Sequence, residues 1–334
     1  MTSINAEAEQ SLIQSAPDEG LRHSLIGLAI LWALLAVVPL AAPNDYIVSL
    51  SVTFLINLIL IGSLNTLIGY SGQISLSHGG FFGLGAYTSG IISAKFGISA
   101  WIGLPAACII AAIAALVIGM PALRLRGHYL AMATLGFNAI LTVLFNQLVG
   151  WTGGPNGLLG VKPFTFFGIP LDTQAKFFPL AWMSAGLIMW FLLNLIHSRT
   201  GRALRAIASS EIAANSLGVN PFRYKLIVFV LTAAMAGFAG SLYVHSNQYA
   251  SPETFGFSAS VLLVAMVALG GWGRYWGAFY GAAIFTAVPE LLRNLHDAEL
   301  LVFGAGMILV LMFFPGGIAA SVETLSRFVR KRLS

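Results

Sequence analysis

Residues able to do chemistry are few in this sequence, and most of them lie in one polar, glycine-rich run. The run contains Gly72, Gln73, Ser75, Ser77 and His78 within an otherwise apolar stretch. Hydroxyl and amide groups can hold a neutral or zwitterionic solute by hydrogen bonds, without fixed charge. Irregular backbone at membrane depth is tolerated only inside protein or along a wet cavity. We therefore predict that this run lines a pathway for a solute; the alternative is that its glycines serve close helix packing.

Four more positions extend this predicted pathway. Tyr87 ends the same run, and Gly270 and Gly271 end a second, short apolar segment. Undersized, Gly-interrupted apolar segments in two halves of a chain are typical of the broken helices of transporters. Glu290 is an ionisable residue near the end of a late apolar segment, and such residues are functional by default. Together with His78 it supports an alternative hypothesis, a stand-alone carrier or channel.

The sequence lacks the usual motifs of nucleotide hydrolysis and metal binding. It contains neither G-x-x-x-x-G-K-[ST] nor H-E-x-x-H, and Cys108 is its single cysteine. A membrane enzyme would have to use Arg126, His128 and Tyr129, which offer no pairing of nucleophile and base. We expect no catalytic residue, no metal site and no cofactor, and the chain has no recognisable site for ATP hydrolysis.

The composition decides which elements must position these residues. Of the 334 residues, 57% are hydrophobic and only 9% are charged. A soluble protein carries about 25% charged residues, so the composition argues against a soluble enzyme, a disordered protein and a disulfide scaffold. The net charge of +5 is no signal for nucleic acid, because basic residues in membrane proteins mostly mark the cytoplasmic loops.

We predict an all-α integral membrane protein with about ten spanning segments, some of them short or discontinuous. The third segment is either a full crossing or a re-entrant one. The expected segments are residues 24–42, 46–68, 76–94, 99–120, 128–149, 178–196, 224–246, 258–272, 275–292 and 299–317.

Cationic residues orient these segments, because Lys and Arg collect in cytoplasmic loops. With the N- and C-termini cytoplasmic, most of the 17 basic residues fall on the inner side. The inner set is Arg22, Arg124, Arg126, Arg199, Arg202, Arg205, Arg223, Lys225, Arg274, Arg327, Arg330, Lys331 and Arg332. The outer set is Lys95, Lys162, Lys176 and Arg293. The expected organisation is a disordered cytoplasmic tail over 1–21, a transmembrane domain over 22–320 and a basic cytoplasmic tail over 321–334.

Two long loops stand out from the apolar segments. The outer loop 150–177 contains Gly153, Gly154, Asn156 and Gly157 in a turn-rich run. The inner loop 197–223 has no proline between residues 201 and 217, so we predict one continuous helix there. Leu204, Ile207, Ala208 and Leu217 would form an apolar stripe on this helix, Gly218 would cap it, and Pro221 would stop its continuation.

Several ordered runs resemble the permeases of branched-chain amino-acid ABC transporters. The first is GYSGQISLSHGGFFGLGAY at 69–87, and the last is GGWGRYWGA at 270–278. The runs LRLRGHYLAMATLGF at 123–137 and TGGPNG at 152–157 are similar to the M-type permease more than to its H-type sister. The segment 201–218 is similar to the cytoplasmic coupling loop, although Ile212 interrupts the E-A-A-x-x-x-G pattern that such loops often show.

This resemblance implies uptake of leucine, isoleucine and valine across the bacterial inner membrane by alternating access. The implied partners are an H-type permease, two ATP-binding subunits and a periplasmic substrate-binding protein, in membrane lipid and without nucleic acid. The coupling residues would be Arg202, Arg205, Glu211, Ala213, Ala214 and Gly218.

Three alternatives stay open. Arg202 and Arg205 are equally explained as positive-inside anchors. The loop 150–177 either faces the binding protein or is a solvated connector. Related permeases carry urea, short amides or other amino acids, and the motifs do not separate these substrates.

Overall fold

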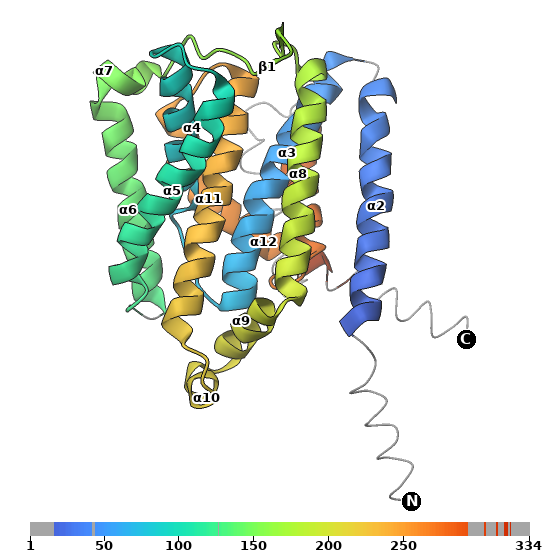
Figure 1. Ribbon diagram of the computed structural model, residues 1–334, viewed down its shortest axis with the longest axis vertical. Helices are drawn as coiled ribbons and strands as arrows, with labels where there is room; N and C mark the ends of the chain where they lie inside the picture. The colour runs from blue at the N-terminus through green and yellow to red at the C-terminus, as the bar shows by residue number, and fades with distance from the viewer. Residues whose placement is uncertain are drawn as a thin grey trace, which may run out of the picture.

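The computed structural model describes residues 17–41, 44–125 and 127–292, together with Gly304, Met312, residues 317–319 and Ser321. Long helices run roughly parallel through it, and a small hairpin lies at one end (Figure 1). The helices are α2 (Pro17–Ala41), α3 (Asp45–Asn65), the π-helix η1 (Thr66–Tyr70), α4 (His78–Ala94), α5 (Ala100–Ala122), α6 (His128–Gln147), α7 (Val149–Thr152), η2 (Gly154–Asn156), α8 (Gln174–His197), α9 (Arg199–Ser209), α10 (Glu211–Ser216), α11 (Pro221–Asn247), η3 (Pro252–Phe255), α12 (Phe257–Gly270) and α13 (Gly277–Leu292). The hairpin strands are β1 (Thr165–Phe166) and β2 (Ile169–Pro170), which pair antiparallel.

The two ends of the bundle differ in what they carry. Helices α9 and α10 project from one end, the α10 end, whereas α7 and β1 lie at the opposite end, the β1 end (Figure 1). The predicted loops 150–177 and 197–223 therefore lie at opposite ends, as expected. Helix α2 begins at the α10 end and stands beside α8.

Helices α3 and α11 form the centre of the bundle. In the most apolar stretch of each helix, 61% of the residues are buried in Asp45–Tyr70 and 67% in Pro221–Asn247. The share is 28% in both α5 and α6. Helices α5, α6 and α8 expose large apolar side chains such as Ile102, Ile140 and Leu187. Within the described residues, five helices are long and apolar enough to cross a membrane. An apolar exterior of this extent fits contact with lipid or with another subunit.

Glycines bring α4 and α11 into close backbone contact. A Cβ added at Gly85 would lie 2.2 Å from the carbonyl oxygen of Gly237, and one at Gly240 would lie 2.1 Å from that of Phe82. No side chain fits between the two helices at these points. The packing explanation therefore holds for these glycines.

The predicted segments from 24–42 to 275–292 each coincide with one helix, and 299–317 lies almost entirely outside the described residues. The two segments expected to be short are short. Helix α4 has 17 residues and α12 has 14. At 1.5 Å per residue, both are shorter than the roughly 30 Å hydrocarbon core of a bilayer.

Helix α2 begins at Pro17, inside the segment predicted as the tail 1–21. Proline is favoured at the first helical position, which fits a helix that begins at Pro17. Residues 1–16 and nearly all of 321–334 lie outside the described residues.

One predicted element is wrong. The continuous helix over 201–217 is divided at Ser210, whose backbone is extended at φ −160° and ψ 113°. The Ser210 side chain accepts a hydrogen bond from the backbone N–H of Ala213, so it caps α10 instead of continuing α9. Serine competes for backbone hydrogen bonds in this way and favours helix starts.

Candidate functional site

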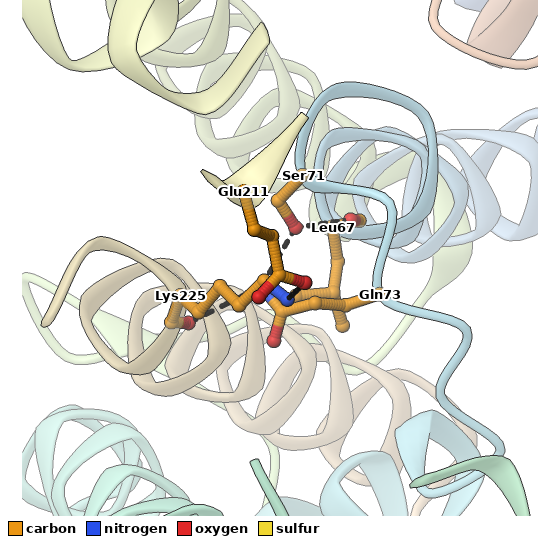
Figure 2. Close-up of polar contacts among 5 residues, drawn as sticks. All are labelled: Leu67, Ser71, Gln73, Glu211 and Lys225. Atoms are coloured by element: carbon orange, nitrogen blue, oxygen red, sulfur yellow. Dashed lines mark hydrogen bonds and ion pairs between the residues drawn. The ribbon is translucent and has the colours of Figure 1, made fainter. Parts of the chain in front are cut away.

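A cluster of polar contacts at the α10 end joins the neighbouring helices α10 and α11 to the segment that follows η1, which is distant from them in sequence (Figure 2). Lys225 of α11 lies with its Nζ 2.5 Å from Oε1 of Glu211 in α10. The Lys225 backbone carbonyl accepts a hydrogen bond from Nε2 of Gln73 at 3.3 Å. Gln73 also donates to Oγ of Ser71 at 2.7 Å, and Ser71 donates to the carbonyl of Leu67 at 2.6 Å. The segment 201–218 is thus connected to the polar run that follows η1.

Local sequence explains how Lys225 and Glu211 come together. Asn220 accepts a hydrogen bond from the backbone N–H of Arg223 and Pro221 occupies the first turn, so α11 begins at a fixed point. Gly218 has a φ of +83°, which ends α10 as predicted and lets the N–H of Val219 reach the carbonyl of Ala214 at 3.1 Å. The short turn 217–220 then returns the chain so that α10 lies against α11.

Helix α9 holds the end of α8. The Arg202 guanidinium donates to the carbonyl of His197 at 3.3 Å, and that of Arg205 donates to the carbonyl of Ile196 at 3.2 Å. Cations suit the carbonyls at a helix C-terminus, so both arginines stabilise the corner between α8 and α9. Leu204 and Ile207 are buried beneath them.

The predicted apolar stripe is only half correct. Leu204 and Ile207 are buried, but Ala208 is exposed and Leu217 is 82% exposed. The break at Ser210 turns α10 to a new direction, which removes Leu217 from the face that α9 presents. Ile212 is also exposed, at 79%, and Ala213 is exposed, whereas Ala214 is buried. Helix α10 therefore presents a short apolar surface away from the bundle.

A groove of about 400 Å³ lies beside this surface. Its walls are the end of α5, helix α10 and the first turn of α11. Arg124, Glu211, Asn215, Asn220 and Lys225 supply its polar lining, and Ile212 and Phe222 supply apolar contacts. A mixed groove beside exposed apolar side chains can receive a complementary protein surface.

The predicted pathway residues of the first run lie together inside the bundle. Gln73, Ser75, Ser77 and His78 are each at most 1% exposed, whereas Gly72 is exposed at the α10 end. Ser75 and Ser77 join their hydroxyls at 2.9 Å, and Nε2 of His78 lies 2.8 Å from Oγ of a serine in α3, Ser63. Ser63 stands two turns before the end of η1, so residues 72–77 rise through the bundle in non-helical form and α4 begins well inside it. The discontinuous segment is thus present as predicted.

Side chains of neighbouring helices form hydrogen bonds with the non-helical backbone of this segment. The N–H of Leu76 donates to Thr134 of α6 at 3.0 Å, and the N–H of Gly79 donates to Oγ of Ser260 in α12 at 3.0 Å. Among the described residues, Oε1 of Gln73 and Oδ1 of Asn138 are buried without a hydrogen-bond partner. An unpaired buried acceptor costs about 1–3 kcal/mol. The segment is therefore held on three sides but is not fully satisfied in this conformation.

The other predicted pathway residues lie elsewhere. Tyr87 donates to the carbonyl of Ala250 at 3.4 Å and is buried among aromatic rings. A Cβ on Gly270 would lie 2.0 Å from the carbonyl oxygen of Gly277, and Gly271 follows with a φ of +118°. Glu290 of α13 accepts a hydrogen bond from the hydroxyl of Tyr46 in the first turn of α3. The predicted pathway is therefore not one site: the structure gathers the first run and leaves these four positions apart.

A cavity of about 350 Å³ lies between α3, α4, α11, α12 and α13, and none of the predicted residues lines it. Thr53 and Asn57 of α3 face it, one helical turn apart, together with side chains of α12. Two polar residues at this spacing in an apolar helix are a sequence signal. Hydropathy does not show that Thr53 and Asn57 line a cavity, because the cavity depends on which helices surround that face of α3.

The predicted outer loop adopts a tight structure at the β1 end. Gly153, Gly154 and Gly157 all have positive φ, at +80°, +60° and +75°. The carbonyl of Asn156 accepts a hydrogen bond from the Tyr249 hydroxyl at 3.2 Å. The loop is thus tied to the segment after α11 rather than hanging free.

Comparison with known proteins identifies the family. The family model described as "Branched-chain amino acid transport system / permease component" matches residues 25–311. The chain is 35% identical over 294 residues to the high-affinity branched-chain amino acid transport system permease protein LivM of Escherichia coli. The match covers 81% of this chain and 69% of LivM.

More distant relatives are also permeases. LivH of Salmonella typhimurium is 29% identical over 276 residues, which cover 76% of this chain and 88% of LivH. The autoinducer 2 import system permease protein LsrC of Yersinia pseudotuberculosis is 26% identical over 279 residues, 80% of this chain and 76% of LsrC. No solved structure matches the chain.

Proposed function

The chain belongs to the family of branched-chain amino acid transport permease components, and from this premise we propose that it is the M-type permease subunit of an ATP-driven importer of leucine, isoleucine and valine. It pairs with an H-type permease, and two ATP-binding subunits and a periplasmic binding protein complete the complex. The similarity to both LivM and LivH supports the pairing.

In this proposal the permease lies in the bacterial inner membrane with about ten spans and with both termini on the cytoplasmic side. The α10 end faces the cytoplasm, because Arg199, Arg202, Arg205 and Arg223 collect there. The β1 end then faces the binding protein with the tight loop at Gly153–Gly157. The positions of the two long loops at opposite ends support this orientation (Figure 1).

The observation that carries the coupling mechanism is the connection from Glu211 through Lys225 to Gln73 (Figure 2). The ATP-binding subunit docks on α10, where Ile212 and Leu217 are exposed beside the groove. Closure of the ATP-binding subunits moves α10, and the ion pair transmits that movement to α11. The Lys225 carbonyl carries it to the segment that starts α4.

Alternating access follows from the missing hydrogen bond in that segment. A segment that leaves Oε1 of Gln73 unpaired in one conformation gains a hydrogen bond if a second conformation supplies a donor. Bistable elements of this kind convert a small displacement into a change between two packed states. The discontinuous run 72–77 is the element that opens the path to one side or the other.

The test uses the purified complex in proteoliposomes with binding protein, and measures leucine uptake and ATP hydrolysis. We expect Glu211→Lys and Lys225→Glu each to lower uptake several-fold, since each single change places like charges together. The double change restores most of the uptake, because it re-forms the pair with opposite polarity. Equal uptake by both single variants and the wild type would contradict the coupling role.

A matched control breaks an ion pair at the other end. Asp172→Asn removes the exposed pair with Lys176 at 2.7 Å, and exposed pairs contribute little. It should leave assembly and the basal ATP hydrolysis, measured without binding protein, unchanged. Co-purification of the ATP-binding subunits with every variant shows whether an effect lies in docking or in transmission.

Uptake by cells tests the substrate separately. Cells that lack the gene should lose radiolabelled leucine uptake and regain it from the plasmid-borne gene, while urea uptake stays the same. Lost urea uptake with unchanged leucine uptake would move this permease to the amide branch of related transporters.

A further inference from the structure

The cavity between α3, α4, α11, α12 and α13 has a mostly apolar lining, with a few hydroxyl groups gathered toward one end. Helix α3 runs from the β1 end to the α10 end, so Thr53 lies nearer the β1 end than Leu60 does (Figure 1). Helix α12 runs in the same sense: its last residue precedes the turn in which Gly273 packs against Gly69, at the α10 end. The hydroxyls of Thr254 and Ser258 therefore lie toward the same end as Thr53.

The part of the cavity nearer the α10 end is lined mainly by aliphatic and thioether side chains. Ile56 and Leu60 of α3 face Leu262, Leu263 and Met266 of α12. Among the lining residues that the structure describes there is no Asp, Glu, Lys, Arg or His. A ligand here is recognised by hydrogen bonds at one end and by apolar contact at the other.

The chemistry of this lining separates the substrate classes that the sequence left open. Urea and short amides present hydrogen-bonding groups in nearly all directions, and an apolar floor would leave those groups unpaired. An aliphatic amino acid presents an ammonium and a carboxylate at one end and a hydrocarbon at the other. The hydroxyls and the first turn of α12 suit the carboxylate, because amides at a helix N-terminus attract negative charge.

Size and rigidity also fit this class of ligand. A cavity of about 350 Å³ lies at the lower end of the range of roughly 300–1,000 Å³ for small-molecule sites. Asn57 faces the cavity, and its Nδ2 donates to Oγ1 of Thr286 in α13 at 3.4 Å. That contact fixes the side chain of Asn57 at the boundary between the polar and apolar parts.

We propose that this cavity is a site within the transport path that receives the side chain of an aliphatic amino acid, with its ammonium and carboxylate groups toward Thr53, Thr254 and Ser258. The proposal rests on the proposed function and deepens it, because it places a substrate preference in the permease itself. Asn57 is a positioning residue at the site, and residues 259 and 262 determine how large a side chain fits.

The experiment compares two substrates in the reconstituted complex, with saturating binding protein loaded with leucine or valine. Ala259→Val narrows the cavity, and we expect it to lower the ratio of leucine to valine uptake at least about threefold. Leu262→Ala widens the cavity and should raise that ratio. Ala259→Phe fills the cavity and should reduce uptake of both substrates about tenfold or more.

A control on the same helix separates a site from a general packing effect. Val261 is exposed and does not line the cavity, so Val261→Phe should leave the leucine-to-valine ratio as in the wild type. Co-purification of the partner subunits and the thermal unfolding midpoint are measured for each variant.

The outcomes are distinct. If the wild-type complex transports leucine and the ratio stays constant in all cavity variants, the site proposal is overturned while the proposed function stands. A constant ratio combined with a lower unfolding midpoint for Ala259→Phe would show that the cavity variants disturb packing alone, which also overturns the site proposal. If the wild type transports neither amino acid, the proposed function itself fails.

Discussion

Nδ1 of His245 in α11 lies 2.6 Å from the carbonyl oxygen of Lys162 in the segment before the hairpin. A carbonyl only accepts, so Nδ1 carries the hydrogen, and Nε2 of the neutral ring accepts from the hydroxyl of Ser89 at 2.8 Å. Ser241 donates in turn to Ser89 at 2.8 Å. The result is one directed chain of hydrogen bonds that ties α4 and α11 to the loop of the β1 end.

Replacement of His245 should be strongly destabilising. His245→Phe keeps the ring but leaves the Ser89 hydroxyl and the Lys162 carbonyl without this partner, at about 1–3 kcal/mol for each buried group. We expect a lower thermal unfolding midpoint in detergent, and a smaller loss for Ser241→Ala, which removes one hydroxyl. His128 is exposed at the start of α6, so His128→Phe is the control. A midpoint for His245→Phe equal to that of the control contradicts the role of the chain.

Close packing of α4 on α11 predicts different effects for two glycines in helices. A Cβ at Gly240 would lie 2.1 Å from the carbonyl oxygen of Phe82, whereas nothing lies within 4 Å of one at Gly136 in α6. Gly240→Ala should therefore separate the helices and lower the yield of folded protein. Gly136→Ala should stabilise α6 by up to about 1 kcal/mol, because alanine is the better helix former. Size-exclusion profiles and unfolding midpoints measure both effects, and equal behaviour of the two variants would refute the packing argument.

Much of the fold could be predicted because spanning segments leave a strong signal. The apolar runs, the position of Gly218 and the short α4 and α12 all follow from hydropathy and glycine placement. The break at Ser210 could not be predicted in the same way, because one local hydrogen bond, from the backbone N–H of Ala213 to the Ser210 side chain, stabilises it. Such a bond changes neither the hydropathy nor the charge of the loop.

The candidate site was only partly accessible from the sequence. The run around Gln73 was recognisable because polar residues are costly in an apolar segment. Its partner Lys225 was counted only as a cationic marker of the inner side, since the fold alone brings it to Glu211. The cavity beside Asn57 was missed for the same reason: only the fold brings α3 and α4 against the late helices α11, α12 and α13 to form its walls.

Gly218 provides a test of the coupling segment. Its φ of +83° is unfavourable for a residue with a Cβ, although a Cβ there would meet nothing within 4 Å. Gly218→Val should therefore loosen the end of α10 without any steric clash, and it should reduce transport and the ATP hydrolysis stimulated by binding protein. Gly136→Ala serves as the control, and membrane insertion should be normal in both. Full stimulation in Gly218→Val would show that the cap of α10 has no part in coupling.

The loop at the β1 end gives a test of binding-protein docking. Gly157 and Gly160 both have positive φ, at +75° and +78°, so alanine at either position has the same kind of backbone strain. The surroundings differ: a Cβ at Gly157 would lie 2.5 Å from the carbonyl oxygen of Ala250, and one at Gly160 meets nothing within 4 Å. Gly157→Ala should displace the loop, and Gly160→Ala should leave it in place.

The expected result is a weaker apparent affinity for binding protein in Gly157→Ala than in Gly160→Ala. The measurement is ATP hydrolysis by the reconstituted complex as the concentration of leucine-loaded binding protein rises. A several-fold increase in the half-maximal concentration of binding protein, at an unchanged basal rate of ATP hydrolysis, assigns the effect to docking. Displacement of the loop leaves the α10 end untouched. Identical titration curves for the two variants would instead make this loop a solvated connector.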